Sequence, residues 1–150
     1  MHPRSLIAAL ALPALTALAA PAAAQEGDAA NGESLFGRQC VACHVVVNDA
    51  GETLAGRNAR TGPNLYAIDQ RPIAGIEDFR YGDSIVDLAA AGGEGAPWTA
   101  ELFIPYVQDP TGFLREHLED RQARSKMAYQ VRSAQDAADI WAYLVSLSPE

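Results

Sequence analysis

Two cysteines and a histidine lie close together in the segment of this sequence that is best equipped for chemistry. Cys40 and Cys43 are separated by two residues, and His44 follows directly. A Cys-x-x-Cys-His run is typical of covalent haem c attachment. Two thiols on one helical turn can each bond a vinyl group of the same porphyrin, which brings the next imidazole under the iron. The segment predicts one haem c, attached through two thioether bonds, with His44 as an iron ligand.

Two other kinds of site use similar residues. A redox-active dithiol has the same cysteine spacing and does not need the histidine. However, no strand–CxxC–helix pattern of the thioredoxin type surrounds Cys40 and Cys43. A zinc site would need a second Cys or His pair at zinc-finger spacing, and the sequence has none. The residues therefore favour haem.

The second iron ligand can be narrowed by counting. Beyond the first 24 residues the chain contains one methionine, Met127, and one histidine besides His44, which is His117. A soft thioether suits a low-spin iron that changes oxidation state without changing ligands. We expect Met127 to be the second ligand, with His117 or an open site as alternatives. His117 shares a helix face with Leu114 and Leu118, which favours a surface or half-buried position instead.

The start of the chain predicts export. His2 and Arg4 precede an apolar stretch over residues 6–20, and an Ala-rich segment at residues 22–24 follows. This order is typical of a cleaved signal peptide. The apolar run contains Pro13 and is shorter than the roughly 20 residues that a membrane span needs, so no permanent anchor is expected. We predict a signal peptide over residues 1–24, cleavage before Gln25, a periplasmic location and a single domain over residues 25–150.

The charge balance bears on partners. Arg4 is the only charged residue among the first 24, so the 11 basic and 19 acidic side chains become 10 and 19, a formal net charge of −9. Such a chain is a poor partner for nucleic acid. From the net charge alone we expect docking on a cationic or neutral partner surface.

The two ends of the mature chain predict the clearest helices. The last helix carries an apolar face and follows a Ser133-x-x-Asp136 capping box; the face consists of Ala137, Ile140, Trp141, Leu144 and Val145. A first helix is expected from Asp28, as N-cap, to the cysteine motif. Its Gly32 leaves room for a close helix crossing, so Gly32 and Phe36 are predicted to face Ile140 and Tyr143.

The middle of the chain predicts shorter helices and long loops. Thr99 is expected to cap a helix that ends near Asp109 and carries Leu102, Phe103, Tyr106 and Val107. Pro110 suits the first position of another short helix. Residues 45–83 are rich in Gly, Asn and Pro and form a far longer loop than usual. The prediction is an all-α fold of about four to five helices, with long loops wrapped around the haem.

Several features occur together in an order that resembles the class I c-type cytochromes, most closely the bacterial cytochrome c2 group. They are Gly32 and Phe36, the Cys40–His44 motif, Thr61-Gly62-Pro63-Asn64-Leu65, Arg71, Tyr81, Trp98, Tyr106, Ser125-Lys126-Met127 and the run from Ile140 to Leu144. The resemblance covers nearly the whole mature chain. It implies the class I cytochrome c fold.

The resemblance also implies roles for single residues. The carbonyl of Pro63 would accept a hydrogen bond from the ring N–H of His44. Side chains at three matching positions would bind the inner haem propionate; these are Arg71, Tyr81 and Trp98. The hydroxyl of Tyr106 would point at the Met127 sulfur and tune the reduction potential.

Two departures from the family pattern stand out. Family members usually ring the exposed haem edge with lysines, whereas Lys126 is the only lysine of this chain. The segment from Thr111 to Arg124 is longer than in mitochondrial relatives, and one extra residue falls between Arg71 and Gly75.

The function that the resemblance implies is that of a soluble, monomeric one-electron carrier rather than an enzyme. It would shuttle electrons from a membrane quinol-oxidising complex to a photosynthetic reaction centre, an oxidase or a reductase. The alternative is a haem enzyme or ligand-binding cytochrome with an open or labile distal iron position. As an enzyme it would need an acid–base residue, for which His117 and Tyr106 are the candidates. A tethered subunit of a larger complex would keep the fold and change the role.

Overall fold

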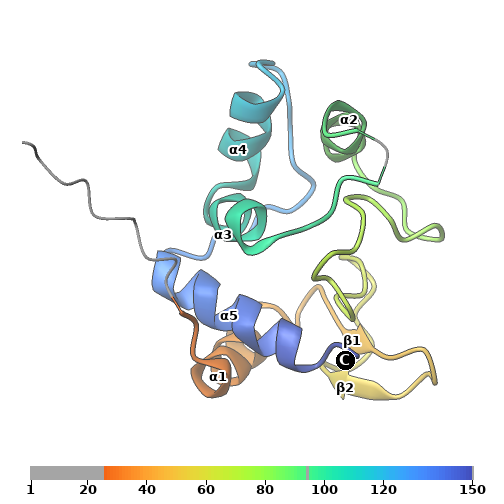
Figure 1. The fold of residues 1–150 in the computed structure, drawn as a ribbon, viewed down its shortest axis with the longest axis vertical. Coiled ribbons are helices and arrows are strands. Elements are labelled where there is room, and N and C mark those ends of the chain that lie inside the picture. Colours follow the sequence, from red (N-terminus) through yellow and green to blue (C-terminus); the bar gives the residue numbers. More distant parts are fainter. Residues whose placement is uncertain (1–25, 94, 150) are drawn as a thin grey trace, which may run out of the picture.

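The computed structural model of the chain describes residues 26–93 and 95–149, so the predicted signal peptide lies outside the described residues. Their elements are α1 (Ala29–Gln39), β1 (Val46–Val47), β2 (Thr53–Ala55), α2 (Asp83–Ala91), α3 (Ala100–Gln108), α4 (Pro110–His117) and α5 (Ala134–Ser146) (Figure 1). The predicted all-α fold is confirmed, with a small hairpin added. Within 26–93 and 95–149 no helix has the length and apolar character that crossing a membrane requires.

The terminal helices α1 and α5 begin where the sequence predicts. The carboxylate of Asp28 accepts hydrogen bonds from the backbone N–H groups of Ala30 at 2.9 Å and Asn31 at 3.2 Å. The hydroxyl of Ser133 accepts from the N–H of Asp136 at 3.3 Å. These side chains satisfy backbone donors that have no partner within the helix, which fixes the first residue of each helix.

Helices α1 and α5 cross with their backbones in close contact (Figure 1). A Cβ atom on Gly32 would overlap the carbonyl oxygen of Asp139 and would lie 2.8 Å from the Cβ of Tyr143. The rings of Phe36 and Tyr143 pack with 5.7 Å between their centroids. The predicted contact of the first and last helices is therefore confirmed for Gly32, Phe36 and Tyr143.

A buried carboxylate joins the same two helices, and the sequence did not predict it. Asp139 of α5 is 2 % exposed. It accepts hydrogen bonds from the backbone N–H of Asp28 at 2.8 Å, from Asn31 Nδ2 at 2.7 Å and from Gln135 Nε2 at 2.8 Å. These donors, the Asp28 N–H most of all, lower the pKa of Asp139 despite its burial.

Helices α3 and α4 have the predicted boundaries. Thr99 precedes α3, but its hydroxyl makes no capping hydrogen bond, and its backbone carbonyl accepts from the first turn instead. Asp109 ends α3 and also caps α4, because its carboxylate accepts from the N–H of Gly112 at 3.0 Å. Pro110 occupies the first turn of α4 as expected.

The long segment after the cysteine motif contains the hairpin of β1 and β2. The strands are antiparallel, with Val46 opposite Ala55 and Val47 opposite Thr53. The side-chain amide of Asn64 extends this pairing, since it accepts from the N–H of Val47 at 3.0 Å and donates to its carbonyl at 2.7 Å. The loop around residue 63 is thereby fastened beside the cysteine motif.

Helix α2 is an element that the sequence analysis did not predict. It begins after Gly82, which offers no side-chain cap, and it buries Ile85 and Leu88 against the core. Its start coincides with the end of the loop expected over residues 45–83. A short helix without a capping side chain has few local signals, so packing rather than local sequence defines it.

Candidate functional site

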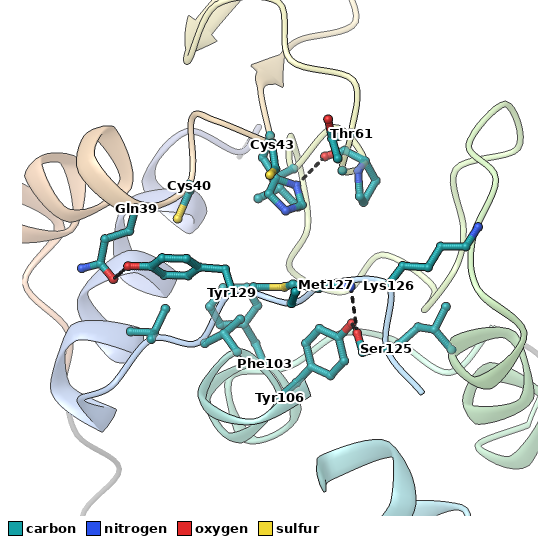
Figure 2. Close-up of a pocket in the computed structure, with 18 of the residues that line it drawn as sticks. Gln39, Cys40, Cys43, Thr61, Phe103, Tyr106, Ser125, Lys126, Met127 and Tyr129 are labelled. Carbon is teal, nitrogen blue, oxygen red and sulfur yellow. Dashed lines mark hydrogen bonds between the residues drawn. The ribbon is translucent and has the colours of Figure 1, made fainter. Parts of the chain in front are cut away.

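A cavity of about 470 Å³ lies between the cysteine motif and the loop that carries Met127. Figure 2 shows Cys40, Cys43 and Thr61 on one side of this cavity, with Met127 and Tyr106 on the other. All nine residues singled out in the sequence line it: Cys40, Cys43, His44, Pro63, Arg71, Tyr81, Trp98, Tyr106 and Met127. The fold thus brings together residues that are far apart in the described chain.

His44 is held in one orientation by the loop opposite it. The turn that follows α1 forms because the N–H groups of Cys43 and His44 both donate to the carbonyl of Cys40, at 3.0 and 2.9 Å. The ring Nδ1 of His44 lies 2.9 Å from the carbonyl oxygen of Pro63. With Nδ1 as donor to this carbonyl, Nε2 carries the lone pair that a metal needs. Burial lowers the pKa of His44, which favours the neutral ring.

Gly62 is required for this arrangement. A Cβ atom there would lie 2.6 Å from Nδ1 and 2.7 Å from Nε2 of His44. Its N–H donates to the carbonyl of Cys43 at 2.7 Å, so the loop is fixed to the cysteine motif as well. Only a residue without a side chain lets the loop approach the imidazole this closely.

Cys40 and Cys43 form no disulfide with each other. Burial, and secondarily the neighbouring Cys43, raises the pKa of the Cys40 thiol to about 12. Redox-active CxxC sites instead lower the pKa of a cysteine so that a thiolate is available. The surroundings of Cys40 therefore differ from those of a dithiol oxidoreductase.

The Met127 side of the cavity is organised by Ser125. The hydroxyl of Ser125 accepts from the N–H of Met127 at 3.0 Å and lies 3.1 Å from the hydroxyl of Tyr106 (Figure 2). The Tyr106 hydroxyl therefore has an oxygen partner in Ser125, the same residue that holds the Met127 backbone. Burial raises the pKa of Tyr106, so the phenol stays protonated near neutral pH.

A polar corner of the cavity is formed by Arg71, Tyr81 and Trp98. The guanidinium Nη1 of Arg71 donates to the carbonyl of Tyr66 at 2.7 Å, whereas its buried Nε has no partner among residues 26–93 and 95–149. Burial lowers the pKa of Arg71 and raises that of Tyr81. The backbone N–H of Trp98 donates to the backbone carbonyl of Arg71 at 2.8 Å, which holds the two residues together.

These features fit a haem. A buried guanidinium N–H without an acceptor calls for an anion, and a haem propionate is a carboxylate. The walls between the polar corner and the cysteines are apolar and include Leu65, Ile85, Phe103, Val107, Val131 and Ile140. Two thiols, an oriented imidazole and a thioether complete the donor set that covalent attachment and axial ligation need.

His117 lies away from this cavity. It is exposed at the end of α4, where its Nδ1 lies 2.9 Å from the carbonyl oxygen of Phe113 and its ring stacks on the Phe113 ring at 3.7 Å. It is not among the residues that line the cavity. The surface position favoured by the sequence is therefore confirmed.

Three contacts at the Met127 loop were not foreseen in the sequence analysis. Lys126 Nζ donates to the carbonyls of Arg80 at 3.0 Å and Tyr81 at 2.9 Å. The exposed Tyr129 donates its hydroxyl to Gln39 Oε1 at 3.0 Å (Figure 2). The loop is thus tied to the segment before α2 and to the end of α1. Only the position of Lys126 and Tyr129 beside Met127 could have drawn attention to them.

Comparison with known proteins places the chain in a family, although no protein-family model matches it. It is 57% identical over 121 residues to cytochrome c2 of Rhodovulum adriaticum, an alignment that covers 81% of this chain and 93% of the relative. It is 51% identical over 135 residues to cytochrome c-551 of Roseobacter denitrificans, covering 90% of this chain and 91% of the relative. The X-ray structure of cytochrome c2 from Rhodobacter sphaeroides matches with a TM-score of 0.76 and 44% identity, covering 81% of this chain and 97% of that one. The chain therefore belongs to the cytochrome c2 family, as an electron carrier whose cofactor is one covalently bound haem c.

Proposed function

We propose that this protein is a one-electron carrier in which His44 and Met127 are the two axial ligands of the haem iron. Cys40 and Cys43 form the two thioether bonds, and Arg71, Tyr81 and Trp98 hold the inner propionate. The observation that supports this most is that the His44 imidazole, oriented by Pro63, and the Met127 thioether line the same cavity as the two cysteines.

The residues around the iron site suit transfer of an electron with little rearrangement. The bound haem supplies an iron that cycles between the ferrous and ferric states. Pro63 fixes the His44 ring, and Ser125, Lys126 and Tyr129 fasten the loop on either side of Met127. Ligands held in this way keep the same positions in both oxidation states, which keeps the reorganisation on transfer small.

Filled axial positions also argue against an enzyme. A haem peroxidase or nitrite reductase needs an open iron position and an acid–base residue beside it. His117 is outside the cavity, and the Tyr106 hydroxyl is engaged with Ser125. Neither candidate acid–base residue is therefore arranged for that chemistry.

The working cycle that we propose is periplasmic. Residues 1–24 direct export and are removed before Gln25, leaving residues 25–150 as one monomeric domain. The carrier takes electrons from a membrane quinol-oxidising complex and delivers them to a reaction centre, an oxidase or a reductase. It docks transiently on both complexes.

The charge around the cavity refines the expected docking surface. Besides Arg71, which is assigned to the propionate, Arg38, Arg124 and Lys126 line the cavity, and no Asp or Glu of the described residues does. The excess of acidic residues in the whole chain therefore lies elsewhere. We include in the proposal that docking at the cavity mouth uses a partner surface carrying carboxylates, rather than the cationic or neutral surface that the net charge predicts.

Two small oxidants of opposite charge test the docking charge. Arg38→Glu should slow oxidation of the reduced protein by ferricyanide and speed oxidation by cobalt(III) tris-phenanthroline, whereas Arg132→Glu, an equal charge change outside the cavity lining, should do neither. Equal effects of the two substitutions would mean that only net charge steers the approach of a partner.

Carbon monoxide binding tests the ligation. The reduced wild-type protein should bind carbon monoxide slowly, whereas Met127→Ala should bind it at once, because the distal position is then open. His117→Ala should behave like the wild type. Rapid binding by the wild type would show that the iron position is open and would support the ligand-binding or enzymatic alternative.

A further inference from the structure

One face of α4 is fastened to the segment that leads into Met127. The hydroxyl Oγ1 of Thr111 accepts a hydrogen bond from the backbone N–H of Ser125 at 3.3 Å. The Nε of Arg115 donates to the backbone carbonyl of Ala123 at 3.2 Å. Thr111 and Arg115 are four residues apart, so they lie on the same face of the helix. The two contacts therefore hold Ala123 and Ser125, which are two residues apart in the segment that leads into Met127, against one face of α4.

Ser125 carries this attachment onward to Met127. The same residue that donates its N–H to Thr111 accepts, through Oγ, the N–H of Met127 at 3.0 Å. Ala123 is 1 % exposed, so the start of the segment is buried as well as hydrogen-bonded. Backbone atoms at residues 123, 125 and 127 are thus each held by a named contact.

Helix α4 is a firm support for these contacts. Its N-terminus is capped by Asp109, and its Phe113 and Leu114 are buried in the core. Phe113 also packs edge-on against Tyr106, with 5.6 Å between ring centroids. Tyr106 in turn contacts the Ser125 hydroxyl, so the helix and the Met127 loop meet a second time through this ring.

We propose that Thr111 and Arg115 are positioning residues for the Met127 thioether, acting through the backbone of residues 123–125. This inference rests on the proposed ligation of the iron by Met127. It assigns a role to the segment from Thr111 to Arg124. Helix α4 holds residues 123–125 at the distance at which the Met127 thioether faces the cavity.

The strength of this positioning can be measured with imidazole as a competing ligand for the ferric iron. Imidazole binds only to molecules from which Met127 has moved away, so its apparent affinity reports how firmly the loop is held. Losing one hydrogen bond to the loop backbone should tighten apparent imidazole binding about five-fold. Thr111→Val removes the acceptor and keeps the side-chain shape, and Arg115→Met removes the donor and keeps the aliphatic stem.

Three control variants separate positioning from general stability. Thr111→Ser retains the acceptor and should bind imidazole like the wild type. Arg132→Met matches the charge change of Arg115→Met at an exposed residue outside the cavity lining. Ser133→Ala removes the α5 cap and should lower resistance to urea without changing imidazole affinity.

The outcomes distinguish this inference from the proposed function. Tighter imidazole binding by Thr111→Val and Arg115→Met, but not by the three controls, is the expected result. Unchanged imidazole affinity in both variants would overturn the inference while leaving Met127 ligation intact. If the wild-type ferric protein lacked a sulfur-to-iron charge-transfer band, the ligation itself would fail, and the inference with it.

Discussion

Replacing Asp139 with asparagine should lower the free energy of unfolding by about 2 kcal/mol. The carboxylate is buried between α1 and α5, where Oδ1 accepts from the Asp28 N–H and from Gln135 Nε2, and Oδ2 accepts from Asn31 Nδ2. Asparagine has the same shape but is neutral and offers one oxygen and one NH₂ group. The Asn31 amide must turn over to present its oxygen to that NH₂ group, and all three hydrogen bonds lose their charge.

The magnitude follows from the hydrogen bonds that are lost. A hydrogen bond to a charged group contributes about 1.5–3 kcal/mol, and a buried donor left without a partner costs a similar amount. The substitution turns three hydrogen bonds to a charged group into weaker neutral ones and forces the Asn31 amide to turn over. The site cannot open to water to compensate, because Gly32 brings the two backbones into contact beside it.

The effect should depend on pH. The donors around Asp139, first of all the Asp28 N–H, lower its pKa in the folded protein below the value of about 3.9 in an unfolded chain. The folded state therefore binds a proton at Asp139 less tightly than the unfolded state does. The contribution of the ionised Asp139 to the free energy of unfolding is thus complete above the unfolded pKa and is lost as the pH falls through the folded pKa. The difference between wild type and Asp139→Asn should narrow in acid.

The assay is urea unfolding of the haem-containing protein, followed by circular dichroism near neutral pH and again in acid. Glu33→Gln is the matched control, since Glu33 is exposed on α1 and the substitution changes the charge equally. Equal losses in Asp139→Asn and Glu33→Gln at neutral pH would refute the reasoning. A deficit of Asp139→Asn that stayed constant into strong acid would refute the linkage to its ionisation.

Two further substitutions test the helix crossing and the Met127 network. Gly32→Ala should destabilise the protein by about 3 kcal/mol, because its Cβ meets the α5 backbone. The control is Gly37→Ala on the same helix, whose Cβ meets nothing, so it should be neutral or slightly stabilising. The midpoints of urea unfolding compare the two variants, and equal midpoints would disprove the close crossing. Tyr106→Phe should cost about 1 kcal/mol of unfolding free energy, because the buried hydroxyl loses its contact with Ser125. The sulfur-to-iron charge-transfer band should stay in place, and a displaced band would indicate a direct bond from the hydroxyl to the sulfur.

Local patterns were sufficient for much of this structure. The Cys40–His44 motif spans only five residues. Helices α1 and α5 have capping side chains and a periodic apolar face, which short-range rules describe well. The glycine at position 32 signalled a close crossing. These features depend on neighbours in sequence, so they could be predicted without the fold.

Other features depend on contacts between distant segments. Helix α2 has no capping side chain and was not predicted. The contact of the Tyr106 hydroxyl with Ser125 was not predicted, because it depends on where Ser125 lies in space. Likewise, net charge does not reveal that the cavity lining contains cations and no acidic residue of the described chain. The donors around Asp139 come from α1 and α5, and only tertiary packing brings them together.

The most direct test of the account is the near-infrared spectrum of the ferric, haem-containing protein beside that of Met127→Ala. Ligation by His44 and Met127 predicts a sulfur-to-iron charge-transfer band in the wild type that disappears in the variant. A high-spin wild-type spectrum without this band, unchanged by Met127→Ala, would contradict the proposed iron site and with it the carrier mechanism.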